Sequence, residues 1–320
     1  MKIINITKLT QLPEEHIIAG DMAEPFYRWF LAHQPKTIST YLPILWGRLH
    51  AWNQKGNESY MNQTEQIIKD LPKDEQYFTI VCEGPAAGLG RLVRMIPNST
   101  VYIACCNGDT NRAEWVDRVI QHGKMEIPPP NQDQISRAFP LLGHSPESLW
   151  KDVEKSMLNN PKTMFASFYG DLETHWCRKR MAEVLYRDQL KYSIHNIAGE
   201  TRLRQDIYFD SMSCSVFSLS PRGTGSTSNR QWEAMLCGSI PVYISDQFWL
   251  PNYPDVDWDE LIVRVHTSEI DNLDCILSSI SLKRINEMTE NGRIFCKKYL
   301  TFGAIFRNII LDLNSNPIRT

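Results

Sequence analysis

The segment from 211 to 243 constrains the fold more than any other part of the chain. It contains two short runs that favour buried strands, at 215–219 and 240–244. Between them, residues 230–237 have the apolar spacing of a helix, and Gly238 follows as a stop signal. A strand, a crossover helix and a second strand form a βαβ unit. Its strands are parallel, and ligands bind beyond their carboxyl ends.

The loop between the first strand and the helix is suited to binding an anion. Gly223 and the glycine and hydroxyl residues of 225–228 let main-chain N–H groups approach a ligand, and the start of the helix adds a favourable dipole. Arg222 and Arg230 flank the loop and can pair with phosphate oxygens. Glu233 lies on the first helical turn, where a carboxylate can accept hydrogen bonds from ribose hydroxyls. The pattern predicts a sugar-nucleotide site, with an ordinary βαβ unit and a solvated loop as the alternative.

Length and charge narrow the classes of function. At 320 residues the chain exceeds a typical single domain, so two domains of roughly 150 residues each are expected. A net charge of −3 provides no general field that would attract nucleic acid or a membrane surface. Any anion site must therefore be local, and we expect no nucleic-acid partner.

The sequence also bears on the compartment. The apolar patch near the N-terminus is interrupted by Asn5 and Thr7 and is too short for a signal peptide, and no stretch approaches the roughly 20 apolar residues of a membrane span. The eight cysteines include no CxxC pair, and Cys82, Cys214 and Cys237 lie in apolar runs, as buried reduced thiols do. We expect a cytoplasmic protein without a transmembrane segment.

Alternating strand and helix patterns predict an α/β protein with two domains. Proline-rich residues 127–130 and the loop-like stretch 140–145 mark the boundary region. We expect an N-terminal domain at 1–155, a C-terminal domain at 156–300 that contains the sugar-nucleotide site, and a C-terminal segment at 301–320 that crosses back onto the first domain. Further predicted strands are 77–82, 100–106, 163–170, 192–197 and 261–265. Further predicted helices are 23–32, 42–52, 58–69, 173–190, 269–280 and 281–298, and the final stretch at 302–313 is the part expected to cross back.

Five motifs in order resemble the exostosin-like glycosyltransferases. They are SVFSLSPRG at 215–223, SNR at 228–230, EA at 233–234, GSIPV at 238–242 and LP at 250–251. Two weaker features agree: FYG at 168–170 followed by Arg178 or Arg180, and IPP at 127–129. The resemblance is strong over about 163–265.

This resemblance implies a GT-B-like fold, in which two Rossmann-type domains with parallel sheets face a cleft. It implies an inverting enzyme that uses a nucleotide sugar, commonly a UDP-sugar, to extend or decorate a polysaccharide or another glycan, including protein glycosylation. The implied donor-binding residues are Arg180, Arg222, Gly223, Ser228, Arg230 and Glu233, with the arginines on the diphosphate and Glu233 on the ribose. Because the sequence shows no membrane anchor, we expect a bacterial or viral enzyme, acting in the host cytoplasm if viral.

Inverting transfer also requires a base that takes a proton from the acceptor hydroxyl, and positive charge that stabilises the departing diphosphate. The arginines supply the charge. The base is expected from the first domain, because the donor occupies the second. Glu83 follows the predicted 77–82 strand and is the first candidate; Asp109, after the 100–106 strand, is its rival. A purely structural role is the alternative for each.

A metal site is not predicted. Asp255 and Asp257 match a DxD pattern that transferases of another fold use to hold a metal, but such patterns are frequent in loops. With arginines and a helix dipole facing the diphosphate, a divalent ion is not required. We expect no cofactor beyond the nucleotide-sugar donor.

Two other functions fit the same motifs. A retaining GT-B transferase would share the ribose carboxylate and the basic diphosphate site, and an inactive module would bind a sugar nucleotide without turnover. The donor sugar stays open among xylose, galactose, glucuronate and N-acetylglucosamine.

Overall fold

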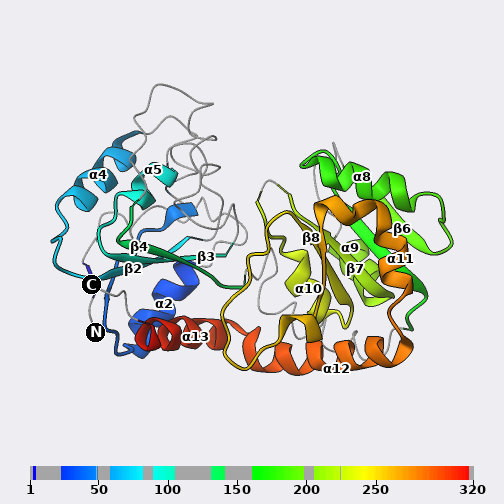
Figure 1. Cartoon of the computed structure of the whole chain (residues 1–320). Helices are drawn as coiled ribbons and strands as arrows, with labels where there is room; N and C mark the ends of the chain where they lie inside the picture. Colours follow the sequence, from blue (N-terminus) through cyan, green and yellow to red (C-terminus); the bar gives the residue numbers. More distant parts are fainter. Residues whose placement is uncertain are drawn as a thin grey trace. The chain divides into compact units, whose positions relative to one another are not determined.

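The computed structural model describes residues 3–4, 23–47, 49, 58–81, 89–104, 131–140, 161–197, 205–223 and 225–316. The chain forms two compact units (Figure 1). The first comprises Met1–Leu141, Leu250–Asn252 and Phe302–Thr320, and the second comprises Leu142–Trp249 and Tyr253–Thr301. Each unit contains one parallel sheet with helices packed on it, which confirms the expected α/β class with two Rossmann-type units. None of the helices in the described part is long and apolar enough to cross a membrane.

The first unit is built on a four-stranded sheet in the order β1-β2-β3-β4, with all neighbours parallel. Its strands are β1 (Thr40–Tyr41), β2 (Tyr77–Val81), β3 (Ser99–Ile103) and β4 (Gln134–Ala138). Its helices are α2 (Ala23–His33), α4 (Glu58–Lys69), α5 (Leu89–Arg94) and α13 (Phe302–Ser315). The strands expected at 77–82 and 100–106 are confirmed. The helix expected at 42–52 is wrong at its start, because residues 42–45 are not helical.

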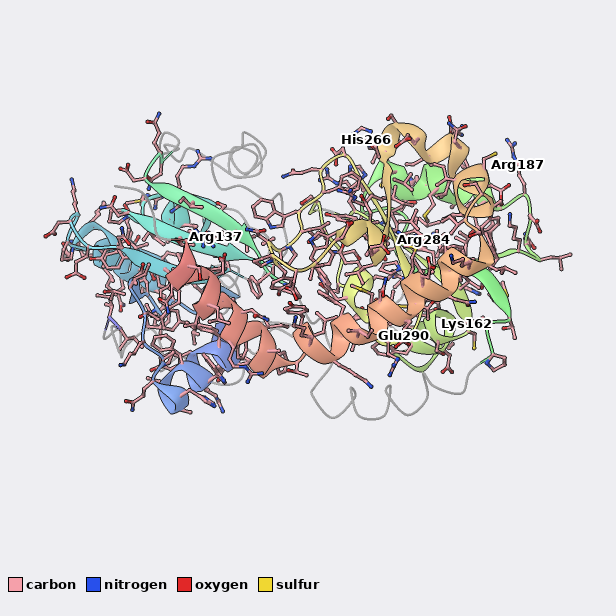
Figure 2. The ribbon with its side chains drawn as sticks, turned by 60° about the horizontal axis from the view of Figure 1, so that its bottom comes forward. Arg137, Lys162, Arg187, His266, Arg284 and Glu290 are labelled. Atoms are coloured by element: carbon pink, nitrogen blue, oxygen red, sulfur yellow. The ribbon has the colours of Figure 1, made fainter. Side chains whose placement is uncertain are left out.

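The C-terminal helix α13 is part of this first unit. Phe306 packs edge-on against Phe26 of α2, with ring centroids 5.2 Å apart. The Tyr102 hydroxyl donates to Asp312 Oδ2 at 2.8 Å, and Arg137 Nη1 donates to the same oxygen at 2.6 Å. Figure 2 shows Arg137 beside this helix. The last helix of the chain is therefore tied to β3 and β4 by a buried phenol and an ion pair.

The second unit has a five-stranded sheet in the order β6-β5-β7-β8-β9, again parallel throughout. Its strands are β5 (Met164–Gly170), β6 (Tyr192–Asn196), β7 (Ser215–Pro221), β8 (Ile240–Ser245) and β9 (Val263–His266). The chain runs from β5 outward to β6 and then returns to place β7 on the other side of β5. The carboxyl ends of β5 and β7 form the switch point at which open α/β sheets bind their ligands.

Helices cover both faces of this sheet. They are α8 (Trp176–Leu185), α9 (Gln205–Ser213), α10 (Arg230–Leu236), α11 (Leu273–Ser278) and α12 (Leu282–Tyr299), with 3₁₀-helices η2 (Trp258–Glu260) and η3 (Thr267–Asn272). One core joins α8, η3 and α11 to the sheet, and a second joins α9 and α10 to Tyr169 of β5. The βαβ unit predicted at 215–244 is confirmed. The expected helix at 173–190 is shorter, since it begins after the His175 cap and ends at Leu185.

The ends of α9 and α10 are fixed locally. Gly238 follows the last turn of α10 with φ at +63°, a left-handed conformation that favours glycine and ends the helix. Lys162, labelled in Figure 2, donates to the carbonyl oxygens of Ser213 at 2.8 Å and Cys237 at 3.5 Å. Burial lowers the pKa of Lys162 to about 8. One lysine thus binds the C-terminal ends of both helices, and their N-terminal ends lie toward the carboxyl edge of the sheet.

Candidate functional site

Two glycines at the switch point allow arginine head groups to lie against the main chain. A Cβ atom added at Gly170, the last residue of β5, would lie 2.9 Å from Arg230 Nη2. A Cβ atom added at Gly223, just beyond β7, would lie 2.9 Å from Arg178 Nη2. A Cβ atom at Gly223 would displace the Arg178 guanidinium group, and one at Gly170 would displace the Arg230 guanidinium group or the Phe168 ring, which also lies 2.9 Å away. The two glycines therefore explain how positive charge reaches the carboxyl ends of β5 and β7.

Arg178 projects from α8 and binds main-chain carbonyl groups. Its Nε donates to Arg222 O at 2.9 Å, its Nη1 to Asp171 O at 2.7 Å, and its Nη2 to Pro221 O at 3.3 Å. Within the described ranges no carboxylate forms an ion pair with it. Burial and then the nearby charge of Arg230 lower the pKa of Arg178 to about 10. The side chain thus remains a cation at neutral pH in a setting that favours an added anion.

Arg230, the first residue of α10, lies close to two aromatic rings. Its guanidinium carbon is 4.5 Å from the ring centroid of Phe168 and 4.8 Å from that of Tyr208. Nη2 donates to Tyr169 O, while Nη1 is buried without a hydrogen-bond partner in the described structure. A buried donor without a partner costs free energy that a ligand oxygen would recover.

Arg222 is the third arginine at the switch point, and Asp246 forms an ion pair with it. Its Nη1 pairs with Asp246, and its buried Nε has no hydrogen-bond partner within the described part of the chain. Burial alone would raise the pKa of Asp246, but the hydrogen bond and charge of Arg222 more than offset this and lower it. We call Arg178, Arg222 and Arg230 the arginine cluster. It presents three largely buried guanidinium groups and two unsatisfied N–H donors at one edge of the sheet.

Glu233 lies one turn further along α10 and is 3% exposed. The hydroxyl of Tyr208, from α9, donates to Glu233 Oε2 at 2.5 Å. Burial, followed by the negative charge of Glu233, raises the pKa of Tyr208 well above its usual value. The phenol therefore stays protonated and acts as a donor. A carboxylate consequently lies beside the arginine cluster, in a position that suits recognition of ligand hydroxyl groups.

The structure brings most of the predicted donor residues together. Arg222, Gly223, Arg230 and Glu233 surround the switch point, and Ser228 Oγ accepts from the main-chain N–H of Arg230 at 3.4 Å. The segment expected to bind the donor therefore forms one local site on β7 and α10.

Arg180 lies elsewhere. Its side chain is 46% exposed and pairs with Asp271 at 2.7 Å and Glu183 at 2.9 Å. On a helix, residues two apart point to different faces, so Arg178 and Arg180 cannot both reach the switch point. The sequence does carry a signal for Arg178: it shares the face of α8 that buries Ala182 and Leu185 at i+4 and i+7. Tyr208 had no comparable signal, because α9 was not predicted.

The two base candidates, Glu83 and Asp109, lie outside the described residues. They follow β2 and β3 along the chain. Both remain predictions.

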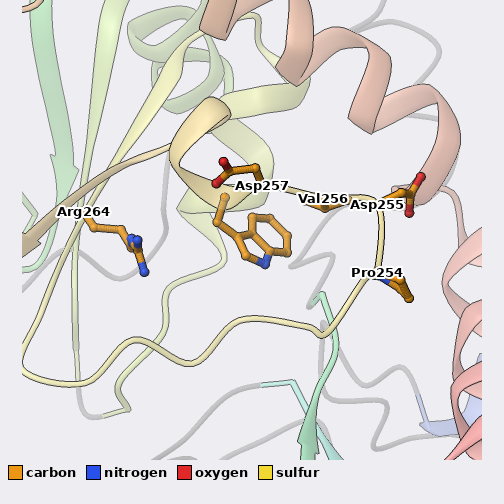
Figure 3. A pocket seen from close by; sticks show the side chains of 6 residues that line it. Pro254, Asp255, Val256, Asp257 and Arg264 are labelled. Carbon is orange, nitrogen blue, oxygen red and sulfur yellow. The ribbon is translucent and has the colours of Figure 1, made fainter.

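The DxD residues have other partners. Asp255 accepts from Lys298 and from the Tyr299 hydroxyl, and these hydrogen bonds lower its pKa. Asp257 Oδ1 accepts from the main-chain N–H of Asp259 at 3.0 Å and caps η2. Both aspartates line an open hollow of about 520 Å³ with Trp258 and Arg264 (Figure 3). In the described part of the molecule, no three His, Cys, Asp or Glu side chains are grouped to hold a metal.

A family comparison matches most of the second unit and the segment before it. The model of the Exostosin GT47 domain matches residues 113–280. A rice protein (Oryza sativa subsp. japonica) named "Probable glucuronosyltransferase" is 41% identical over 166 residues, which are 52% of this chain and 36% of that protein. An Arabidopsis thaliana protein named "Probable glucuronoxylan glucuronosyltransferase" is 28% identical over 152 residues, 46% of this chain and 32% of that protein.

A shorter match links the chain to a differently named relative. The "Probable beta-1,4-xylosyltransferase IRX10" of Arabidopsis thaliana is 38% identical over 73 residues, 23% of this chain and 18% of that protein. The matched segments thus cover well under half of each relative. All three are plant proteins, so they give no support to the expected bacterial or viral source. Among solved structures, trehalose-6-phosphate synthase (OtsA) has a TM-score of 0.38 and 9% identity, over 82% of this chain and 78% of that one.

Proposed function

Because the chain belongs to the exostosin GT47 family, we propose that it is an inverting glycosyltransferase that moves a sugar from a UDP-sugar donor to a hydroxyl group of a glycan acceptor. The arginine cluster is the observation that carries this proposal. Three largely buried guanidinium groups with two unsatisfied N–H donors suit a diphosphate, which is doubly charged and rich in acceptor oxygens. The names of the plant relatives support sugar transfer as the reaction.

The cluster would act on the leaving group. As transfer proceeds, the acceptor oxygen bonds to the anomeric carbon while the bond from that carbon to the diphosphate oxygen breaks. Negative charge then grows on the departing UDP, and guanidinium groups already in place stabilise it without reorganisation. We assign to Arg178 the contact that the resemblance implied for Arg180, because Arg180 is engaged with Asp271 and Glu183.

The remaining roles follow from position. Glu233 would accept hydrogen bonds from the ribose, and Gly223 and residues 225–229 would offer main-chain N–H groups to the phosphates. The acceptor proton would pass to Glu83 or, failing that, to Asp109. Donor binding would need no divalent ion, because the guanidinium groups balance the diphosphate charge.

The donor panel should begin with UDP-glucuronate and UDP-xylose, which correspond to the sugars in the relatives' names. Ligands that bind the native state raise its melting temperature by mass action. We expect UDP and at least one UDP-sugar to stabilise the protein equally with and without EDTA. No stabilisation by any nucleotide would overturn the proposal. NMR of the product anomeric configuration then separates inversion from retention.

A substitution at the base candidate tests the chemical step. Glu83→Gln should leave UDP affinity unchanged and lower transfer by about 100-fold, because the acceptor proton loses its base. Asp109→Asn is the matched variant. Normal turnover in Glu83→Gln with a loss in Asp109→Asn would move the base to Asp109.

A further inference from the structure

Tyr208 lies within the proposed donor site, although its sequence context indicated no role for it. It projects from α9 into the core shared with α10, where it contacts Tyr169 with ring centroids 6.4 Å apart. The residue is 6% exposed. Figure 1 shows α9 and α10 packed on this sheet. Such burial prevents the phenol from moving far from its two polar neighbours.

The hydroxyl of Tyr208 contacts one of these neighbours. It donates to Glu233 Oε2 and, being protonated, acts as a donor throughout the neutral range. A hydrogen bond from a fixed donor sets the rotation of a carboxylate, and therefore the direction in which its lone pairs point. The Tyr208 hydroxyl therefore contributes to the orientation of the Glu233 carboxylate.

The ring of Tyr208 contacts the other neighbour. Its centroid is 4.8 Å from the guanidinium carbon of Arg230, and the ring centroid of Phe168 is 4.5 Å from the same carbon. Aromatic faces attract a cation most strongly where water is excluded. Both rings lie near the guanidinium group, and its Nη1 remains unsatisfied among the described residues. The hydroxyl and the ring of one side chain thus act on different parts of the site.

We propose that Tyr208 is a positioning residue with two separable functions: its hydroxyl orients Glu233 toward the ribose, and its ring holds Arg230 toward the diphosphate. This inference rests on the proposed function, since it concerns the same nucleotide site. It makes Tyr208 the link between recognition of the nucleoside and recognition of the phosphates.

Two variants of Tyr208 separate these functions. Tyr208→Phe removes only the hydroxyl, and Tyr208→Leu also removes the aromatic face. Tyr192→Phe is the matched control, because the Tyr192 hydroxyl also donates to a carboxylate, that of Asp274, but from the first residue of β6 at the amino edge of the same sheet. Calorimetric titration of each variant of the 320-residue chain with UDP, 2′,3′-dideoxy-UDP and pyrophosphate gives the three affinities needed.

The expected pattern depends on the ligand. Tyr208→Phe should weaken UDP binding about tenfold and leave dideoxy-UDP and pyrophosphate within about twofold, because only the ribose hydroxyls report on Glu233. Tyr208→Leu should weaken pyrophosphate as well, by about fivefold. Tyr192→Phe should bind all three ligands as the wild type does. In transfer assays, Tyr208→Phe should raise the donor KM and keep most of kcat.

The inference and the proposed function fail in different ways. Equal losses for UDP and dideoxy-UDP in Tyr208→Phe, or no loss for either, would overturn the positioning role while the site remained a nucleotide site. The positioning role would also be overturned if the wild-type protein bound UDP and dideoxy-UDP equally well. A wild-type protein that binds neither UDP nor pyrophosphate would overturn the proposed function, and the inference with it.

Discussion

Arg137 in the first unit and Arg178 in the second are both largely buried, but they bind different partners. Arg137 pairs with the Asp312 carboxylate, which also accepts from Tyr102, so charge and hydrogen bonds are balanced inside the protein. Arg178 binds three main-chain carbonyl groups and lies near two other arginines. The first arrangement fixes α13 to the sheet. The second leaves positive charge that an added anion would balance, and this difference distinguishes a structural arginine from a ligand-binding one.

The largest expected effect is on ligand affinity in the second unit. Arg222→Ala should weaken UDP binding by about 2–4 kcal/mol, because the diphosphate loses a buried cation. Calorimetric titration measures this loss directly. Arg264→Ala is the control, since Arg264 pairs with Asp259 on the surface of the same unit. Undiminished UDP binding in Arg222→Ala would remove that residue from the site.

Arg137, which pairs with Asp312, should affect stability and not ligand affinity. Arg137→Ala should lower the free energy of unfolding by about 2 kcal/mol, because it leaves the Asp312 carboxylate without its charged donor, and it should leave UDP affinity unchanged. Chemical denaturation followed by tryptophan fluorescence reports the stability. Arg28→Ala, which removes an exposed pair with Glu24, should change it little. A loss of UDP affinity in Arg137→Ala would contradict the distinction between a structural arginine in the first unit and ligand-binding arginines in the second.

A second ion pair of the first unit, between Glu65 and Arg91, predicts how the stability of the protein depends on pH. Hydrogen bonds from Arg91 and Lys69 lower the pKa of Glu65 from 4.5 to about 2. A carboxyl group whose folded pKa is depressed contributes stability above its unfolded pKa and loses it as pH falls. Stability should therefore fall between pH 4.5 and 2, and less steeply in Glu65→Gln. Melting temperatures over this range test the sign, and identical slopes for both proteins would contradict it.

The parts of the fold that could be predicted from sequence are those with strong local patterns. The apolar runs of β2, β7 and β8 and the helix α10 with its glycine stop were confirmed because local pattern and final structure agree there. The strand β4 was missed, since its QISRA sequence is polar and its residues are mostly half-buried. Helix α9 was missed because it is nine residues long and lacks a marked apolar stripe.

The same limits apply to the site. The sequence could predict that Arg222, Arg230 and Glu233 lie close together, because they lie around one short loop and are near one another along the chain. Arg178 reaches the site from another helix, and only the buried face of α8 distinguishes it from Arg180. Tyr208 forms its hydrogen bond with Glu233, a residue 25 positions later in the sequence. Contacts of that kind depend on helix packing, which a single sequence does not specify.

The most direct test of the arginine cluster compares Arg178→Met with Arg180→Met in calorimetric titrations with UDP and pyrophosphate. The two residues lie on one helix and carry the same charge, but Arg178 lies at the switch point and Arg180 is paired on the surface. We predict that Arg178→Met weakens both ligands about 100-fold and that Arg180→Met binds them within about twofold of the wild type. Loss of affinity in Arg180→Met with normal binding in Arg178→Met would contradict the site described here.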